Sequence, residues 1–400
     1  MSKIFGTDGI RGTVNTFPIT PEAVIKIGVA IADVLGADTA DGLKIIIGKD
    51  TRLSSNWIES AIVEGICSRG INVIIAGVLP TPAVAYLTKD LSLCAGIVIS
   101  ASHNPFNDNG IKIFLSDGNK LSQDLEVAIE KRIFADDFSQ NLIPSQNNGV
   151  VNFLDDASSR YASFLLKAVP VCLKRETKIV LDCANGATSF IAHNLFSTIG
   201  AEVIVINDNP DGRNINDNCG SQYPQSLSES VIAERASCGF AFDGDGDRVI
   251  AVDEQGKTLT GDQILTICGA MLKQEGKLKN NIIVRTVMSN FGMTHALQRL
   301  GIDSKITAVG DKHVAEELKS SGAIIGGEDS GHIIFAQYLP TGDGMLTALQ
   351  VLAAMQKENK SLSELASIMS VLPQVLINVE TRQRYDFMAV PEIAKIIYDV

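Results

Sequence analysis

The chain has 400 residues, more than one hydrophobic core usually holds, so we expect several domains. Its formal net charge of -12 repels phosphate polymers and anionic lipids, which argues against nucleic acid or a membrane surface as a partner. The amino-terminal residues lack the apolar core of a signal peptide, and no apolar run approaches the roughly 20 residues that span a bilayer, so we expect a cytoplasmic protein.

The first motif is the glycine-rich stretch 5–12, F-G-T-D-G-I-R-G, which precedes any clear helix. Its glycines give the backbone freedom to aim Arg11, whose planar guanidinium suits phosphate oxygens. An ordinary surface turn with a solvated arginine explains these residues equally well. The stretch by itself leaves both interpretations open.

Helix and strand patterns then alternate up to about residue 134. They predict helices over 22–35, 55–69, 82–87 and 124–134, and strands at 44–48, 72–76 and 97–99. Such alternation is typical of a doubly wound α/β domain. The stretch 136–152 has no periodicity and is predicted to be an interdomain linker.

A polar loop follows the apolar run 97–99, which fits a buried parallel strand. Open α/β sheets bind ligands at the carboxyl ends of such strands, where this loop presents Ser102, His103 and Asn104. Lys112 follows on the returning strand. A hydroxyl nucleophile, an imidazole, an amide and an ammonium are suited to accept and neutralise a transferred phosphoryl group. A simple turn is an equally good explanation, because serine, asparagine and glycine commonly form loops.

The second unit repeats the alternation, with helices over 157–168, 189–199 and 227–234 and strands at 178–181, 203–206 and 239–242. Its last strand leads into D-G-D-G-D-R, in which Asp243, Asp245 and Asp247 alternate with glycines. Hard oxygen ligands of this kind favour Mg²⁺. An EF-hand is excluded because Arg248 stands where that loop needs glycine, whereas a solvated acidic turn remains the alternative.

The third unit has predicted helices over 261–274, 290–300, 312–321, 344–357 and 362–369, and strands at 282–285, 305–308 and 323–326. The last of these strands leads into G-E-D-S-G-H, residues 327–332. Glu328 and Ser330 suit sugar hydroxyls and His332 can move a proton near neutral pH, although a structural histidine explains the motif equally well. A strand at 374–379 and a helix over 390–398 follow, too little to bury a core of their own.

The three units therefore each deliver one polar loop, and loops that meet in one cleft would form a phosphoryl-transfer site for a polyol. No Walker A motif occurs, so a nucleotide is not implied as the phosphate donor.

Five motifs occur along the chain in the order F-G-T-D-G-I-R-G, I-S-A-S-H-N-P with D-N-G-I-K, D-G-D-G-D-R, R-T-V-M-S-N and G-E-x-S-G-H. Together they resemble the motifs of the α-D-phosphohexomutase superfamily. Among its branches, they are most similar to those of the bacterial phosphoglucosamine mutases. The resemblance covers about residues 1–370. It implies an enzyme, an intramolecular phosphotransferase of the isomerase class, with three consecutive doubly wound α/β domains around a central cleft. The implied domains are 1–152 with the phosphoserine loop, 153–254 with the metal loop, 255–370 with the sugar loop, and 371–400 as the start of a truncated α+β fourth domain.

The resemblance also implies roles for the residues singled out above. Ser102 would carry the phosphate, and Mg²⁺ would be held by that phosphate and by Asp243, Asp245 and Asp247. Arg11, His103, Lys112 and Arg248 would surround the phosphoserine, Lys112 or His332 would serve as general acid and base, and Glu328, Ser330 and Asn104 would bind the sugar.

The implied reaction interconverts glucosamine 6-phosphate and glucosamine 1-phosphate, with glucosamine 1,6-bisphosphate as intermediate and activator, in the route to UDP-N-acetylglucosamine. The partner would be a small phosphosugar, and the resemblance suggests a homodimer. Phosphomannomutase or phosphoglucomutase specificity is one alternative. The family's R-x-S-G-T-E-P phosphate loop does not occur before Val400, so a phosphosugar-binding protein with little mutase activity is the other.

Overall fold

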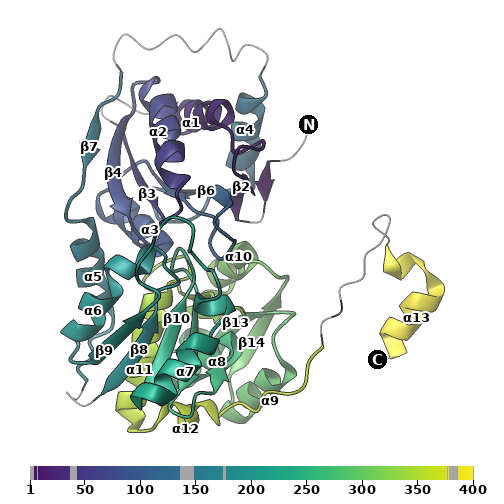
Figure 1. Cartoon of the computed structure of the whole chain (residues 1–400). Coiled ribbons are helices and arrows are strands. Elements are labelled where there is room, and N and C mark those ends of the chain that lie inside the picture. Colours follow the sequence, from purple (N-terminus) through teal and green to yellow (C-terminus); the bar gives the residue numbers. More distant parts are fainter. Residues whose placement is uncertain are drawn as a thin grey trace.

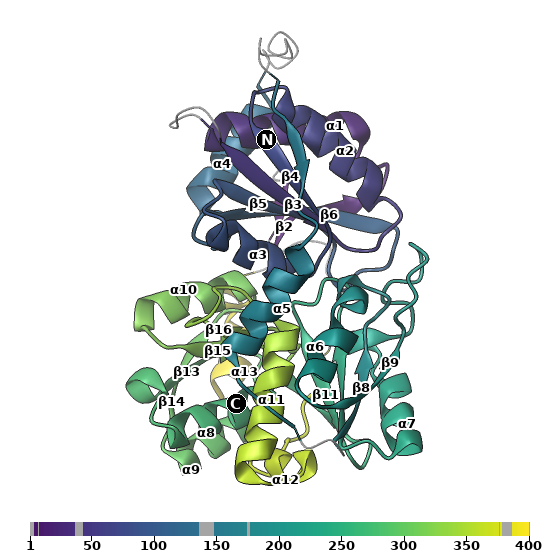
Figure 2. The same cartoon turned by 90° about the vertical axis from the view of Figure 1, so that its left-hand side faces the viewer.

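Three β-sheets organise the chain, and each carries one of the predicted polar loops next to a strand end. The structure is a computed structural model that describes residues 4–6, 8–36, 43–135, 148–173, 177–375, 377 and 386–399. The first sheet and its helices lie above the other two in Figure 1, and Figure 2 shows the second and third sheets side by side beneath it. The prediction of successive α/β units is confirmed.

The first sheet is mixed and has seven strands in the order β1-β2-β6-β5-β3-β4-β7. Its strands are β1 (Phe5–Gly6), β2 (Gly9–Thr13), β3 (Lys44–Lys49), β4 (Asn72–Val78), β5 (Ala95–Ile99), β6 (Asp108–Leu115) and β7 (Val151–Phe153). β3 pairs in parallel with β4 and β5, whereas β6 runs antiparallel to β5 and β2. Residues 100–107 therefore turn the chain at the carboxyl end of β5.

Alternating isoleucines let this sheet bury both of its faces, because successive strand side chains point to opposite sides. Ile45 and Ile47 of β3 pack in one cluster with residues of α1 (Pro21–Leu35), α2 (Ser55–Cys67) and α4 (Gln123–Ile133). Ile46 belongs to the other cluster, with residues of α3 (Thr81–Asp90). α3 thereby lies on the face that meets the second unit, where it packs on α5 (Ala157–Ala168).

Local signals set where two of the long helices begin. α1 starts after Thr20, whose hydroxyl accepts from the N–H of Ala23 at 3.3 Å, and Pro21 stands in its first turn. α8 (Gly261–Gln274) starts with a capping box in which Thr260 and Gln263 hydrogen-bond each other's backbone. The predicted starts of both helices agree closely with the observed ones.

The second sheet has the strand order β12-β11-β10-β8-β9, and the third has the order β14-β13-β15-β16. The second unit contains β8 (Lys178–Asp182), β9 (Glu202–Ile206), β10 (Cys238–Phe242), β11 (Val249–Asp253), β12 (Thr258–Leu259), α5, α6 (Ala192–Thr198) and α7 (Gln225–Glu234). The third contains β13 (Ile282–Thr286), β14 (Asp303–Thr307), β15 (Ile325–Gly327), β16 (Ile333–Phe335), α8, α9 (Phe291–Leu300), α10 (Asp311–Ser321), α11 (Gly344–Glu358) and α12 (Leu362–Ala366).

Helix α11 joins the second and third units, as Figure 2 shows. It packs against β10 and β11 of one unit and against α8 of the other. One apolar cluster runs through all three units and includes Ile46, Phe240, Ile283 and Leu349. This shared core fixes the strand ends, and hence their loops, relative to one another.

Most predicted elements differ from the observed ones by a few residues at their ends, but three predictions are wrong in kind. The predicted helix 189–199 is divided into a 3-10 turn (Ala187–Phe190) and α6. Ile191 between them has a φ of -124°, which is outside the helical region. The N–H of Ala187 donates to Gly244 O at 2.8 Å, so the turn is tied to the loop 243–248 and does not continue as one helix.

The predicted linker 136–152 is wrong at its carboxyl end, because Val151–Phe153 forms the edge strand β7, which pairs in parallel with β4. The side chains of β7 are all exposed, and its three residues are too few for alternation to identify a strand. Residues 136–147 of the predicted linker lie outside the described part of the chain.

The carboxyl-terminal segment also departs from the prediction. The predicted strand 374–379 is not formed at Gln374, Val375 or Ile377, and its other residues lie outside the described part. The helix predicted over 390–398 is α13 (Pro391–Asp399), which lies apart from the three units in Figure 1 and leaves Ile396 and Tyr398 exposed. Among the helices that the structure describes, none is both long and apolar enough to cross a bilayer.

Candidate active site

Three loops from the three sheets come together. We call them the serine loop (100–107, between β5 and β6), the aspartate loop (243–248, between β10 and β11) and the histidine loop (328–332, between β15 and β16). Each begins where a strand ends at its carboxyl edge, which is where ligands bind in open α/β sheets. The sequence predicted all three positions.

Ser102 lies at the contact between the serine and aspartate loops. It is only 1% exposed, and its Oγ donates to Oδ2 of Asp243 at 2.6 Å. Nδ1 of His103 lies 3.2 Å from the same hydroxyl. Ser102 has a φ of 54°, a left-handed conformation that is uncommon for serine. In this conformation the hydroxyl faces the aspartate loop.

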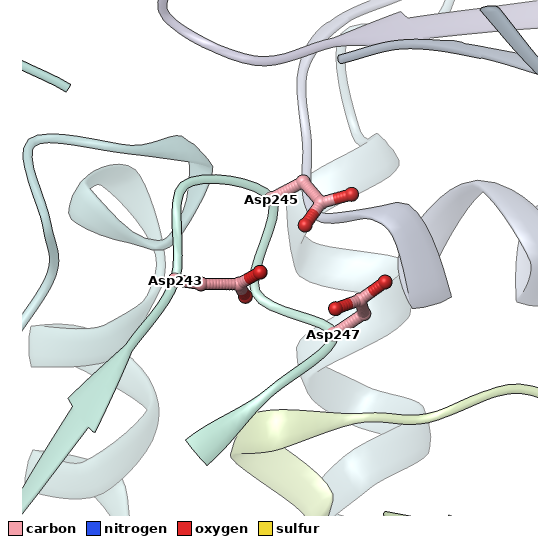
Figure 3. Close-up of side chains that lie close together, drawn as sticks. All are labelled: Asp243, Asp245 and Asp247. Carbon is pink, nitrogen blue, oxygen red and sulfur yellow. The ribbon is translucent and has the colours of Figure 1, made fainter. Parts of the chain in front are cut away.

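The three aspartates of the aspartate loop are buried and turn their carboxylates toward one another (Figure 3). One oxygen from each lies within 4.8 Å of the others. Oδ1 of Asp245 and Oδ1 of Asp247 have no hydrogen-bond partner among the described residues. Buried carboxylate oxygens without donors are suited to a divalent cation with oxygen ligands. The residues present therefore fit a metal site.

The pKa values of these neighbouring aspartates move in opposite directions. Burial, followed by the charges of Asp247 and Asp245, raises the pKa of Asp243 well above its ordinary value. Burial also opposes ionisation of Asp247, but Lys112 and His332 outweigh it and hold the pKa of Asp247 well below its ordinary value. Asp247 thus holds its negative charge more firmly than Asp243 does.

Lys112 on β6 is enclosed by carboxylates. Its Nζ lies 2.7 Å from Oδ2 of Asp245, 3.1 Å from Oδ2 of Asp247 and 2.9 Å from Oδ2 of Asp8. Burial lowers the pKa of Lys112, but the three carboxylates outweigh it and raise that pKa well above its ordinary value. Lys112 therefore keeps its proton and neutralises the aspartate loop.

A cavity of about 390 Å³ opens beside these groups and is lined by residues of all three units. Six of the predicted site residues line it: Arg11, His103, Asp247, Arg248, Glu328 and His332. Burial, followed by the charges of Arg248 and Arg11, lowers the pKa of His103 to about 4, so this imidazole is neutral at physiological pH. Two guanidinium groups and an imidazole around one cavity are suited to bind a phosphate.

His332 connects the cavity to the aspartate loop. Its Nδ1 lies 3.5 Å from Oδ1 of Asp247, and its Nε2 accepts from the N–H of Gly342 at 3.1 Å. A Cβ at residue 342 would lie 2.6 Å from the ring, so any other residue there would displace the imidazole. Burial lowers the pKa of His332, but Asp247 and then Asp311 outweigh it and raise the pKa above its ordinary value of 6.5.

The three predicted sugar-binding residues differ in their positions. Glu328 lines the cavity, and its Oε1 accepts from the N–H of Gly310 at 3.0 Å. Asn104 and Ser330 are not among the described residues that line the cavity. The amide of Asn104 donates to Oδ2 of Asp108 at 2.9 Å, whereas the Ser330 hydroxyl is buried without a hydrogen-bond partner in the described part of the chain.

Several residues that hold the site together were not predicted from the sequence. Asp8 lies inside the first motif and forms ion pairs with Arg11, Lys112 and Lys120. Arg52 follows the carboxyl end of β3, a position that the strand-end rule used for the other loops would have identified. Thr81, whose hydroxyl donates to Oδ2 of Asp245, had no local signal.

Comparison with known proteins gives the family. Models described as "Phosphoglucomutase/phosphomannomutase, alpha/beta/alpha domain" I, II and III match residues 2–140, 159–256 and 260–372. The phosphoglucosamine mutase of Syntrophus aciditrophicus is 54% identical over 401 residues, covering 100% of this chain and 89% of that protein. That of Syntrophotalea carbinolica is 49% identical over 396 residues, covering 99% of this chain and 87% of that protein.

A solved structure shows the same fold. The phosphoglucomutase/phosphomannomutase family protein from Burkholderia thailandensis has a TM-score of 0.79 at 24% identity, covering 94% of this chain and 80% of that one. The chain therefore belongs to the phosphoglucomutase/phosphomannomutase family, and within it to the phosphoglucosamine mutases, which are isomerases.

Proposed function

We propose that this chain interconverts glucosamine 6-phosphate and glucosamine 1-phosphate, with Ser102 as the carrier of the phosphoryl group. The observation that supports this most directly is the 2.6 Å hydrogen bond from Ser102 Oγ to Asp243, at the edge of the three-aspartate cluster. A hydroxyl in this position, with the Lys112 ammonium buried nearby, can receive a phosphoryl group whose charge is balanced in place. The substrate follows from the relatives named above.

The proposed reaction consists of two transfers that balance each other. First, the bond from phosphorus to Ser102 Oγ breaks and a bond forms from phosphorus to O1 of glucosamine 6-phosphate. The O1 hydroxyl gives up its proton, and Ser102 Oγ gains one. The resulting 1,6-bisphosphate then turns over in the cavity. In the second transfer its O6–phosphorus bond breaks and the phosphoryl group returns to Ser102 Oγ, whose hydroxyl gives up its proton, while O6 gains one. Glucosamine 1-phosphate leaves, and no co-reactant is consumed.

In this proposal, different cavity residues bind the phosphate, bind the sugar and transfer the proton. Arg11, His103 and Arg248 would bind phosphate oxygens, and Glu328 would accept hydrogen bonds from the sugar hydroxyls. We assign proton transfer to His332, because it lines the cavity and an imidazole changes protonation near neutral pH.

Lys112 receives a different role in this proposal. Its raised pKa and its three carboxylate partners favour charge balance over proton exchange. An ammonium whose pKa is raised in this way would stabilise an incoming phosphate beside the aspartate loop without losing its own proton.

We propose Mg²⁺ as the cation of the aspartate loop, held by Asp243, Asp245, Asp247 and the phosphate on Ser102. When bound, it would stabilise the charge on the phosphoryl oxygens. The all-oxygen donor set and Oδ1 of Asp245, which is buried without a hydrogen-bond partner among the described residues, support a hard cation.

The proposed setting is the cytoplasm, with a small phosphosugar as the partner and neither nucleic acid nor membrane involved. The net charge of -12 supports the exclusion of anionic polymers. A homodimer remains a prediction from the family resemblance, and light scattering on the purified chain tests it.

The test of the function is a coupled assay of the purified 400-residue chain with Mg²⁺, catalytic 1,6-bisphosphate and, in parallel, the 6-phosphates of glucosamine, glucose and mannose. Intact-mass analysis accompanies it. We expect the highest kcat/KM with glucosamine 6-phosphate and one phosphate on Ser102. A preference for glucose or mannose would support the other specificity. A phosphorylated Ser102 without turnover would support a phosphosugar-binding protein with little mutase activity, and a chain that neither takes up phosphate nor turns over would contradict the proposal.

A further inference from the structure

We infer that Arg52 and Asn216 are positioning residues that hold the serine loop from two sides and keep Ser102 in the conformation from which it transfers phosphate. The inference rests on the proposed function. It concerns residues that touch the backbone of the serine loop.

Arg52 holds the serine loop from within the first unit. Its side chain is buried, and its Nε donates to Oδ2 of Asp50 at 2.8 Å. Its Nη2 donates to the carbonyl oxygens of Ser102 at 3.0 Å and Asn104 at 2.7 Å. Its Nη1 donates to the carbonyl oxygen of Asp108 at 3.1 Å. A planar guanidinium with several fixed donors is suited to hold several carbonyls of one loop at once.

Asp50 extends this support to the N–H side of Ser102. Its Oδ2 accepts from the hydroxyl of Ser100 at 2.6 Å, and that hydroxyl accepts from the N–H of Ser102 at 2.9 Å. Both backbone polar groups of Ser102 are therefore held by one network that begins at the end of β3.

Asn216 holds the same loop from the second unit. It is 7% exposed, and its Nδ2 donates to the carbonyl oxygens of Ser102 at 2.9 Å and of Asn104 at 3.1 Å. These are the two carbonyls that also accept from Arg52, and each oxygen has two lone pairs to do so. The backbone N–H of Asn216 donates to Ala184 O at 2.9 Å, which anchors it to its own unit.

The contact of Gly244 with the Ser102 carbonyl and the Asn216 amide leaves no space for the serine loop to shift toward the aspartate loop. A Cβ at Gly244 would lie 2.7 Å from the carbonyl oxygen of Ser102 and 2.8 Å from Nδ2 of Asn216. The Ser102 carbonyl, the Asn216 amide and the aspartate loop are thus in direct contact. The position of the Ser102 backbone is set relative to the aspartates across the boundary between two units.

This arrangement matters for transfer because Ser102 has an unfavourable backbone conformation. A serine with a φ of 54° relaxes to negative φ unless its surroundings prevent it, and that change rotates the hydroxyl away from Asp243. Phosphoryl transfer requires attacking and leaving oxygens in line, and a misplacement of about 1 Å can lower a rate on the order of 10²-fold. The two residues would therefore act on kcat more than on substrate binding.

Asn216 offers the sharper test, because substitution of the fully buried Arg52 can prevent folding. Asn216→Asp keeps the size of the side chain and its tolerance of the left-handed backbone at a φ of 58°, but places an acceptor against two carbonyls. Asn216→Gly tolerates the same backbone and removes the side chain. Asn218→Asp and Asn218→Gly are matched controls, because Asn218 lies in the same loop with a φ of 53°, is exposed, and donates to Asp217.

We expect Asn216→Asp to lower kcat on the order of 10- to 100-fold with little change in KM, and the Asn218 variants to behave as wild type. A second readout needs no turnover. In the enzyme without phosphate or substrate, Asn216→Gly should accelerate hydrogen exchange in residues 101–109, and Asn218→Gly should not. This readout separates failure of the inference from failure of the proposed mutase function.

The inference is overturned if the Asn216 and Asn218 variants show the same exchange in residues 101–109, whatever their activity. It is also overturned if the Asn216 variants lose kcat only in proportion to their loss of thermal stability, and the Asn218 variants lose kcat equally. A lowered kcat and faster local exchange in the Asn216 variants alone support it.

Discussion

Thr81 of the first unit donates its hydroxyl to Oδ2 of Asp245 in the second unit at 2.6 Å, and its N–H donates to the carbonyl oxygen of Asp245 at 2.8 Å. One residue in the first turn of α3 thus orients both the side chain and the backbone of an aspartate 164 positions away. The same Asp245 oxygen also accepts from Lys112 at 2.7 Å. Loss of a partner that orients a metal-binding carboxylate in this way typically lowers metal affinity about 10- to 100-fold.

Thr81→Val should weaken divalent-metal binding by about 10- to 100-fold, because it removes the hydroxyl and keeps the shape of the side chain. Isothermal titration with Mg²⁺ or Mn²⁺ on the unphosphorylated chain measures this. Thr88→Val is the matched control, because Thr88 is a buried threonine of the same helix whose hydroxyl donates only to Val84 O, at 2.7 Å. Equal metal affinity in the two variants would contradict the prediction.

Ser102→Ala and Ser102→Gly should both lose the phosphate and at least about 10³-fold of the turnover, because the proposed nucleophile is absent. Intact mass and the coupled assay measure the two losses. The glycine variant matters because it tolerates a φ of 54°, whereas alanine is strained there. Mutase activity near the wild-type level in Ser102→Gly, with its folding intact, would rule out Ser102 as the phosphate carrier.

His332→Gln should lower kcat by about 10²- to 10⁴-fold and remove from the pH–rate profile the limb that belongs to the imidazole. As a base, His332 acts when neutral, so in the wild type the rate should fall as the pH drops below its pKa, which is raised above 6.5. Substitution of Lys112 by Met should lower the rate and leave this limb in place. If the limb disappears with Lys112→Met and persists in His332→Gln, the two roles are reversed.

Gly342→Ala should lower kcat as well, by less than His332→Gln. The added Cβ would lie 2.6 Å from the imidazole, which must then move away from Asp247 and from the Gly342 N–H. Steady-state kinetics on both variants compares the losses. An unchanged kcat in Gly342→Ala would show that the position of the ring is not critical.

Asp343→Asn should change how stability depends on pH. Asp343 is buried, its oxygens accept from the N–H of Leu346 at 2.9 Å and from the hydroxyl of Tyr161 at 2.7 Å, and burial raises its pKa from 3.8 to about 6. The folded state therefore holds this proton at a higher pH than the unfolded state. Wild-type stability gains from Asp343 below pH 3.8 and loses that gain as the pH rises to about 6.

The wild type loses at most about 3 kcal/mol of its free energy of unfolding in this way, since one pKa unit corresponds to about 1.4 kcal/mol. Urea unfolding of both proteins at several pH values measures it. Asp343→Asn should lack this contribution, so its stability relative to wild type should rise as the pH increases from 4 to 7. If the free energies of unfolding of the two proteins differed by the same amount at every pH, the prediction would be contradicted.

The three functional loops were predictable because their signals are local. A β-branched apolar run followed by polar and glycine residues identifies a strand end, and D-G-D-G-D-R places three carboxylates on one short loop by itself. The starts of α1 and α8 were predictable for the same reason, since Thr20 and Thr260 cap residues within the first turn of each helix. Local patterns failed at β7, whose three exposed residues are too few to show a pattern. They also failed at 189–199, where the preceding turn is held by a hydrogen bond from Ala187 to Gly244.

The amino-acid sequence by itself determined the α/β class, the positions of the three loops and the chemistry that each offers. Only the tertiary structure decided which groups meet: Lys112 with Asp245 and Asp247, Ser102 with Asp243, Thr81 with Asp245, and Asn216 with the serine loop. These partners are more than 100 residues apart, and no local pattern relates them. Their distances depend on how three sheets pack around one apolar core, and that packing is the sum of many weak, non-directional contacts.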